Sequence, residues 1–251
     1  MHILIAMPTA DAHVHVRTLK SLMGTCHDLA RRGITFSFGF RDQCDVATSR
    51  NRLVADFLAH EALSHLLFVD NDMEFPTKAV GRLIDADTDV VGAVYPKRGL
   101  DLARVEAILA AAPSGARPPL RTAVAAAMDY VVRPLPGDDA GARRAAIVPV
   151  AGIGMGLTLI RRDVFTRLAT SRDVPVAHPA DGPHPRIVGF FDRARTRRGT
   201  MISDDYAFCE RWRRLCDGEV YADLTGDVGH LGSFAFTGDY REAVRQRSGP
   251  G

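Results

Sequence analysis

The chain lacks several features that would place it in a specialised class. Its 251 residues carry 32 Lys and Arg against 30 Asp and Glu, a formal net charge of +2. A charge this small does not favour non-specific binding to nucleic acid or to an acidic membrane surface. No apolar run approaches the roughly 20 residues that span a bilayer. The N-terminus has no basic region, and its apolar run ends at Pro8, unlike a signal peptide. We therefore expect a cytoplasmic protein.

Paired cysteines and the common nucleotide-binding motifs are also missing. The four cysteines form no CxxC pair, which predicts reduced thiols rather than a disulfide frame or a zinc site. No Gly-Lys-Ser/Thr occurs, so there is no Walker A loop. The Gly-rich segment 151–156 comes late in the chain, whereas a dinucleotide fingerprint opens the first strand–helix unit. Close approach of its backbone to a sugar or to a neighbouring strand is the better interpretation.

The first half of the chain does show a regular alternation of short apolar runs and amphipathic segments. The pattern predicts strands at 3–7, 34–40, 66–69 and 90–95, and helices at 18–30, after a Thr48-Ser49 cap, and at 77–84. Repeated strand–helix units of this size favour an α/β fold with a parallel sheet. With 46% hydrophobic residues, the chain can bury a substantial core in one domain.

The second half gives weaker signals. We expect Ala-rich helices at 102–112 and 121–128, two strands around a turn at 130–135 and 146–150, a strand at 157–160 and a helix at 163–168. The segment 171–200 is rich in Pro, Gly, Arg and His and predicts a loop, and its run of arginines (193, 195, 197 and 198) is a solvated surface or a closing loop. Ser203 is predicted to cap a helix with an apolar stripe at Phe208, Trp212 and Leu215.

The strongest local signal is Asp70-Asn71-Asp72, which directly follows the apolar run at 66–69. Residues two apart on an extended chain point to the same side. The carboxyl end of a parallel strand is where α/β sheets bind ligands. Carboxylate oxygens suit Mg²⁺ or Mn²⁺, with substrate phosphates completing the coordination shell. The alternative is an acidic turn that ends the strand.

Two later segments are further candidates. Asp204 and Asp205 follow the predicted cap, where acidic side chains favour the helix dipole without any other role. Adjacent carboxylates also repel each other, so one of them can instead be held as a base or an acceptor ligand. His230 stands between Gly229 and Gly232 and is either a third metal ligand or a structural histidine.

Taken in order, these segments resemble the GT-A glycosyltransferases, particularly the family-2-like and Anp1-like bacterial and phage members. The matching segments are 3–9, 49–52, 68–76, 91–98, 152–160, 203–209 and 229–232. The resemblance implies an α/β, Rossmann-like GT-A fold, with a mostly parallel central sheet flanked by helices. It implies one catalytic domain over 1–235: a nucleotide-binding half (1–99), a variable insertion (100–145) and an acceptor half (146–235). A polar tail follows at 236–251.

The resemblance also implies roles for individual residues. A divalent metal, Mn²⁺ or Mg²⁺, would bind the diphosphate of a nucleotide-sugar donor, with Asp72 as its main ligand and Asp70 and His230 beside it. The nucleotide pocket would be lined by Pro8, Thr9, Arg50, Asp70 and Asn71. Asp204 or Asp205 would be the catalytic base, and Gly154, Met155 and Gly156 would border the sugar and acceptor.

The function expected from the sequence is therefore a metal-dependent, inverting transfer of a sugar to a hydroxyl group. The acceptor would be a glycan, a lipid-linked glycan, a protein or a modified nucleic acid. One alternative is a sugar-phosphate nucleotidyltransferase, which normally carries a Gly-rich basic loop after the first strand. In this chain the corresponding residues 8–13 contain no glycine and are not basic, which ranks this alternative lower. The other alternative is a non-catalytic module that binds nucleotide sugars. The donor, the acceptor and the oligomeric state stay open.

Overall fold

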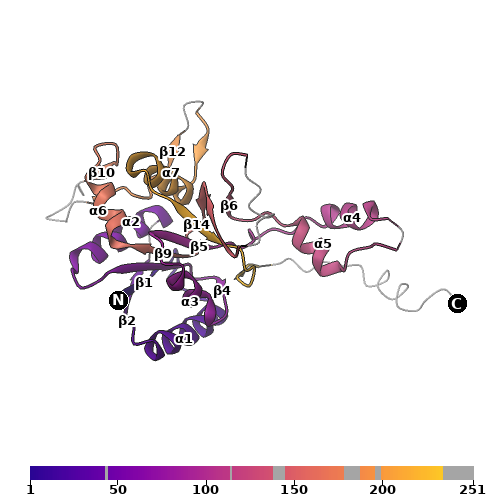
Figure 1. Cartoon of the computed structure of the whole chain (residues 1–251), viewed down its shortest axis with the longest axis horizontal. Coiled ribbons are helices and arrows are strands. Elements are labelled where there is room, and N and C mark those ends of the chain that lie inside the picture. The colour runs from indigo at the N-terminus through magenta and orange to yellow at the C-terminus, as the bar shows by residue number, and fades with distance from the viewer. Residues whose placement is uncertain (43–44, 114, 138–144, 178–186, 196–198, 234–251) are drawn as a thin grey trace.

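A seven-stranded sheet forms the centre of the protein in a computed structural model, which describes residues 1–42, 45–113, 115–137, 145–177, 187–195 and 199–233 (Figure 1). The strand order is β2-β1-β3-β9-β5-β14-β7. The strands are β1 (His2–Pro8), β2 (Thr35–Arg41), β3 (His65–Val69), β5 (Val90–Ala93), β7 (Ile147–Val150), β9 (Leu157–Arg161) and β14 (Val220–Asp223).

The sheet is mixed, but most of its strands run in one direction. β1 is parallel to β2 and β3, and β5 is parallel to β14. β9 lies antiparallel between β3 and β5, and β7 is antiparallel to β14 at the edge. The five strands β1, β2, β3, β5 and β14 therefore share one direction. The predicted α/β class is confirmed, with two antiparallel strands supplied by the second half of the chain.

Helices cover both faces of the sheet. Successive side chains of β1 point to opposite faces and are apolar on both, so each face needs a covering layer. Ile3 and Ile5 pack against α1 (Val16–Arg31) and α3 (Lys78–Asp85). Leu4 and Ala6 point to the opposite face, which is covered by α2 (Val46–Ala59), α6 (Arg162–Ala169) and α7 (Asp204–Cys216). The β1 strand is buried on both sides, as its almost wholly apolar sequence predicts.

Short elements complete the described part of the chain. α4 (Leu102–Ala111) and α5 (Leu120–Ala127) form a hairpin with a small apolar cluster of its own, projecting from the body (Figure 1). Four two-stranded pairs join β4 (Met73–Glu74) to β15 (Gly229–His230), β6 (Val132–Arg133) to β8 (Gly152–Ile153), β10 (Val176–Ala177) to β11 (Ile187–Val188), and β12 (Ala194–Arg195) to β13 (Met201–Ile202). No helix within the described ranges is long and apolar enough to cross a membrane.

Three local expectations need correction. The second helix is capped by Asp45, whose carboxylate accepts hydrogen bonds from the N–H groups of Ala47 and Thr48, so it begins before the predicted Thr48-Ser49 cap. Segments 130–135 and 146–150 do not pair as a hairpin, because β6 pairs with β8 and β7 pairs with β14. The predicted loop 171–200 contains the short strands β10, β11 and β12 in its described part.

Other expectations are confirmed, confirmed in part, or lie outside the described residues. Ser203 does occupy the cap position of α7, but its side chain makes no capping hydrogen bond. The three described cysteines are free thiols, as expected, and Cys44 lies outside the described residues. Two of the four arginines in the predicted basic run (197 and 198) and the predicted tail 236–251 also fall outside them.

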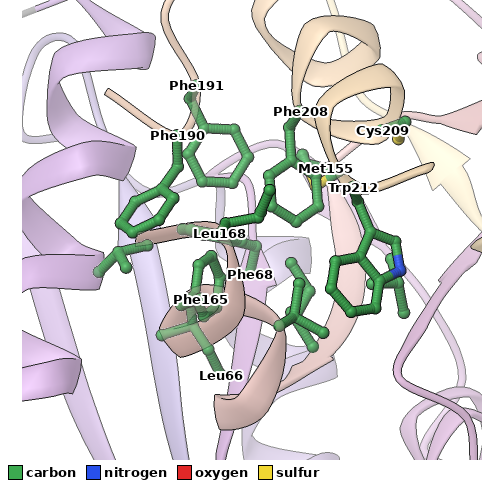
Figure 2. Packing of buried hydrophobic residues seen from close by; sticks show 14 of the residues in the cluster. Leu66, Phe68, Met155, Phe165, Leu168, Phe190, Phe191, Phe208, Cys209 and Trp212 are labelled. Carbon is green, nitrogen blue, oxygen red and sulfur yellow. The ribbon is translucent and has the colours of Figure 1, made fainter. Parts of the chain in front are cut away.

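Aromatic side chains fix α7 against the sheet. Phe208 on this helix stacks on Phe191, with ring centroids 4.7 Å apart and an interplanar angle of 15° (Figure 2). Phe165 on α6 contacts both Phe190 and Phe208. These rings are fully buried, as is Trp212 one turn further along α7. The cluster therefore sets the position of the first turn of α7, which carries Asp204 and Asp205.

We expect Phe208→Ala to lower the free energy of unfolding by about 3–5 kcal/mol, because truncating a buried ring leaves a cavity as well as losing apolar burial. Denaturant unfolding followed by circular dichroism measures this loss. Met201→Ala, at a side chain that is 52% exposed, is the control and should change stability by no more than about 0.5 kcal/mol. A loss below about 1 kcal/mol for Phe208→Ala would contradict this packing.

Candidate active site at the carboxyl ends of the parallel strands

Backbone hydrogen bonds bring three of the sequence motifs together where β3 ends. The N–H of Asp70 donates to the carbonyl of Gly156 at 3.0 Å, which joins the acidic segment to the Gly-rich segment. The carbonyl of Asp72 accepts from the N–H of Leu231 at 2.7 Å, next to His230 on β15. These segments are more than 70 residues apart in sequence, so only the sheet topology makes them neighbours.

Arg50 on α2 links the acidic segment 70–72 to the acidic start of α7. Its side chain is 3% exposed, and its Nη1 donates to Oδ2 of Asp204 at 2.6 Å and to Oδ1 of Asp205. Its Nη2 donates to Oδ1 of Asp70 at 3.1 Å. The third guanidinium nitrogen, Nε, is buried and has no hydrogen-bond partner among the residues that the structure describes. One buried cation thus holds three carboxylates from two distant segments.

The electrostatics of this group favour a proton on Asp205. Burial, together with the nearby charges of Asp204 and Asp70, outweighs the opposing charge of Arg50 and raises the pKa of Asp205 to about 7. Its Oδ2 also accepts a hydrogen bond from the N–H of Met155 at 3.2 Å. A carboxylate with a pKa near neutrality can accept and release a proton under physiological conditions.

Asp72 lies beside His230 and Arg98, away from the Arg50 group. His230 Nε2 is 3.4 Å from Asp72 Oδ2, and Arg98 Nη1 is 2.8 Å from the same oxygen. Burial opposes ionisation of Asp72, but the hydrogen bond and charge of His230 and the charge of Arg98 outweigh it and lower its pKa. Arg98 was not among the residues predicted from sequence, although it ends the segment 91–98 that carries part of the resemblance.

The hydrogen bonding of His230 bears on cation binding. Its Nδ1 lies 3.1 Å from the carbonyl oxygen of Pro96, which can only accept, so Nδ1 carries a proton. In the neutral ring, Nε2 then directs a lone pair toward the Asp72 carboxylate. Such a contact is favourable only with a proton or a metal cation between the two groups. A backbone carbonyl that orients a metal-binding imidazole in this way is a common arrangement.

The three predicted metal ligands do not form one cluster. The Asp70 carboxylate faces Arg50 rather than Asp72 and His230. Among the residues that the structure describes, no three His, Cys, Asp or Glu side chains gather closely enough to hold a metal ion. Asp72 and His230 nevertheless fit a site with two protein ligands, of the kind that Mg²⁺ and Mn²⁺ complete with substrate phosphates and water.

The glycines of the Gly-rich segment make room for a tyrosine. A Cβ atom at Gly154 or Gly156 would lie 2.3 or 2.7 Å from the hydroxyl oxygen of Tyr95, which follows β5. That oxygen accepts a hydrogen bond from the N–H of Gly156 at 2.9 Å. Burial and the charges of Asp70 and Asp205 raise the pKa of Tyr95 well above its ordinary value. The close approach expected at these glycines is therefore to Tyr95; contact of residues 154–156 with a substrate stays a prediction.

The residues predicted for the nucleotide pocket divide into two groups. Pro8 ends β1 and Thr9 follows it, buried, with its N–H donating to the carbonyl of Arg41 at 2.8 Å. Asn71 instead holds the first loop, since its Nδ2 donates to the carbonyl of His13 at 2.8 Å. Both groups lie at the carboxyl ends of β1 and β3, and binding of a nucleotide there stays a prediction.

The chain was compared with protein families, curated proteins and solved structures. No family model matches the chain, and no curated protein matches it. One similar solved structure is A197 from STIV, at 16% identity and a TM-score of 0.49, covering 93% of this chain and 87% of that one. Another is a glycosyltransferase involved in the glycosylation of the major capsid of PBCV-1, at 10% identity and a TM-score of 0.31, covering 66% and 63%. With TM-scores below 0.5, neither similarity assigns a function to this chain.

We expect the raised pKa of Asp205 to make the protein less stable as pH rises. The folded chain keeps a proton on Asp205 up to about pH 7, whereas in the unfolded chain this carboxyl releases its proton near its ordinary value of 3.8. The resulting stabilisation is complete at low pH and is lost as pH rises through the folded pKa, a change on the order of 4 kcal/mol. Asp205→Asn removes this dependence.

Denaturant unfolding at a series of pH values between about 4 and 8 measures the effect. The control is Asp173→Asn, at a carboxyl that is 66% exposed, which should follow the wild-type pH profile. If Asp205→Asn and wild type lose the same stability over this range, Asp205 does not hold the proton.

Proposed function

We propose that the chain is a GT-A-type glycosyltransferase that moves a sugar from a nucleoside-diphosphate sugar to a hydroxyl acceptor. One observation carries the proposal: the buried Arg50 joins Asp70 to Asp204 and Asp205 at the carboxyl end of β3, where α/β sheets bind ligands. Asp72, two residues after Asp70, pairs instead with His230. The site therefore has one acidic position suited to a cation and a second suited to proton transfer, which are the two needs of this reaction.

The donor end of the site would be formed by Asp72, His230 and Arg98. Asp72 and His230 would hold a divalent cation, which when bound stabilises the negative charge that develops on the leaving nucleoside diphosphate. The side chain of Arg98, which pairs with Asp72, is 56% exposed. Its guanidinium would turn from Asp72 to the diphosphate, where it can form two parallel hydrogen bonds.

The acceptor end would be formed by Asp205. Its pKa of about 7 suits a base that takes the proton of the attacking hydroxyl. Arg50 holds the carboxylate in one orientation, and the N–H of Met155 fixes its second oxygen beside the Gly-rich segment. A base on the acceptor side corresponds to direct displacement of the diphosphate, so the sugar would change its anomeric configuration.

We expect a nucleoside diphosphate to stabilise the protein only with a divalent cation, because the phosphates complete the coordination of Asp72 and His230. The measurement is a thermal-shift panel of UDP, GDP, CDP and ADP, each with Mn²⁺, with Mg²⁺ or with EDTA. Asp72→Asn should abolish the shift produced by the responding nucleotide. His230→Gln should weaken it.

The matched control is Asp129→Asn, whose exposed carboxylate pairs with Arg104 on the projecting hairpin and should leave the shift intact. An equal shift in Asp72→Asn, or a shift that persists in EDTA, would remove Asp72 from the donor site. No shift with any nucleotide would leave the segment 70–72 as an acidic turn and would sink the proposal.

For catalysis, we expect Asp205→Asn to reduce kcat roughly 10²- to 10⁴-fold while nucleotide binding is retained, because the variant loses the base but keeps the donor end. Transfer is measured with the responding nucleotide's sugar donors, and the anomer of the product is read by NMR. The expected product is inverted.

Three outcomes would contradict parts of this mechanism. Full activity in Asp205→Asn would exclude it as the base. A product that retains the donor configuration would exclude direct displacement. Release of pyrophosphate from a nucleoside triphosphate and a sugar phosphate would identify a nucleotidyltransferase instead.

A further inference from the structure

One edge of the central sheet carries an uncovered row of aromatic side chains. Phe36, Phe38 and Phe40 alternate along β2 on the face that also carries Ile3, Ile5 and Met7 of β1. The three rings contact each other in sequence, with centroids 6.0 and 5.8 Å apart. Phe38 and Phe40 are nevertheless 42% and 55% exposed. Contact along the row therefore does not remove these rings from solvent.

The row is exposed because α1 does not reach over the edge of the sheet. A groove of about 690 Å³ separates the Phe38 and Phe40 rings from Leu19 and Met23 of α1. Met23 is 66% exposed on the far side of this groove. On the opposite face of β2, α2 packs closely, since a Cβ at Gly39 would lie 3.2 Å from Leu53.

The backbone of β2 is also open. Within the described part of the chain, β2 pairs with β1 on one side and is the last strand on the other. It has seven residues, contains no proline, and carries one charged side chain, Arg41, at its end. Proteins usually protect such an edge with charge, proline, a bulge or a covering element. An unprotected edge with an aromatic face is therefore a surface suited to another strand.

We propose that this edge is a homodimer interface, in which β2 of one copy pairs antiparallel with β2 of a second copy about a twofold axis at Phe38. This register makes the strand complementary to itself. Phe38 lies opposite the partner's Phe38, and Phe36 lies opposite the partner's Phe40. Arg41, the only charge on the strand, lies opposite the partner's Thr35, so no like charges meet.

The same arrangement extends the aromatic face of the sheet. Antiparallel pairing places a second row of phenyl rings beside the first, about 5 Å away, on the same face of the extended sheet. Aromatic pairs across neighbouring strands stabilise such sheets. A strand without aromatic side chains at alternate positions would leave these rings without cross-strand aromatic partners.

The test is the oligomeric state, which needs no knowledge of the donor or acceptor. Sedimentation velocity across a dilution series should show wild-type protein at twice the chain mass of 27.3 kDa. Phe38→Lys and Phe38→Asp each place two like charges on the twofold axis and should raise the dimer dissociation constant at least about tenfold. An equimolar mixture of the two variants should recover the dimer, because Lys then faces Asp.

The matched control is Leu102→Lys, at a side chain on α4 that is 57% exposed and distant from β2; it should remain dimeric. Circular dichroism of each variant checks folding, and recovery in the mixture shows that both variants fold. Monomeric wild-type protein at every concentration would overturn the proposal. A dimer that persists in Phe38→Lys would place the interface elsewhere. Binding of a fluorescent apolar dye to monomeric wild type, lost in Phe38→Lys, would make the groove a small-molecule site instead.

Discussion

The buried guanidinium of Arg50 is the interaction on which the candidate site depends. Three carboxylates converge on it, and without this cation Asp70, Asp204 and Asp205 would repel each other in a region from which water is largely excluded. Removing one partner from a buried ion group leaves uncompensated charge, which costs several kcal/mol. Arg50 therefore holds the end of β3 and the start of α7 at a fixed separation, and a proton on Asp205 reduces the excess negative charge.

The position of Arg50 is itself fixed by packing around α2. The guanidinium carbon lies 5.9 and 6.0 Å from the ring centroids of Phe68 and Phe191. The next residue, Asn51, accepts a hydrogen bond from the N–H of Phe191 at 2.9 Å and donates one to Asp192 at 2.8 Å. The aromatic cluster under α7 thus continues to the charged group above it. Phe68 and Phe191 therefore belong to the hydrophobic core and also position Arg50 in the candidate site.

Sequence patterns predicted the fold better in the first half of the chain than in the second. The predicted strand at 66–69 and helix at 77–84 agree with β3 and α3 to within a residue or so, because buried apolar runs and helical periodicity are local signals. β14 gave no such signal: it is four residues long and ends in Asp223, a buried carboxylate paired with Arg82. Its place in the sheet comes from hydrogen bonds to β5 and β7, which lie far away in sequence.

The sequence by itself determined which residue types are available for chemistry: two acidic segments, a late histidine and a Gly-rich segment. It could not determine how they are grouped. The tertiary structure placed Asp70 with Arg50 and Asp205, and Asp72 with His230 and Arg98, although Asp70 and Asp72 are two residues apart. The physical reason is that side-chain partners are set by strand order and helix packing, which depend on contacts between distant parts of the chain.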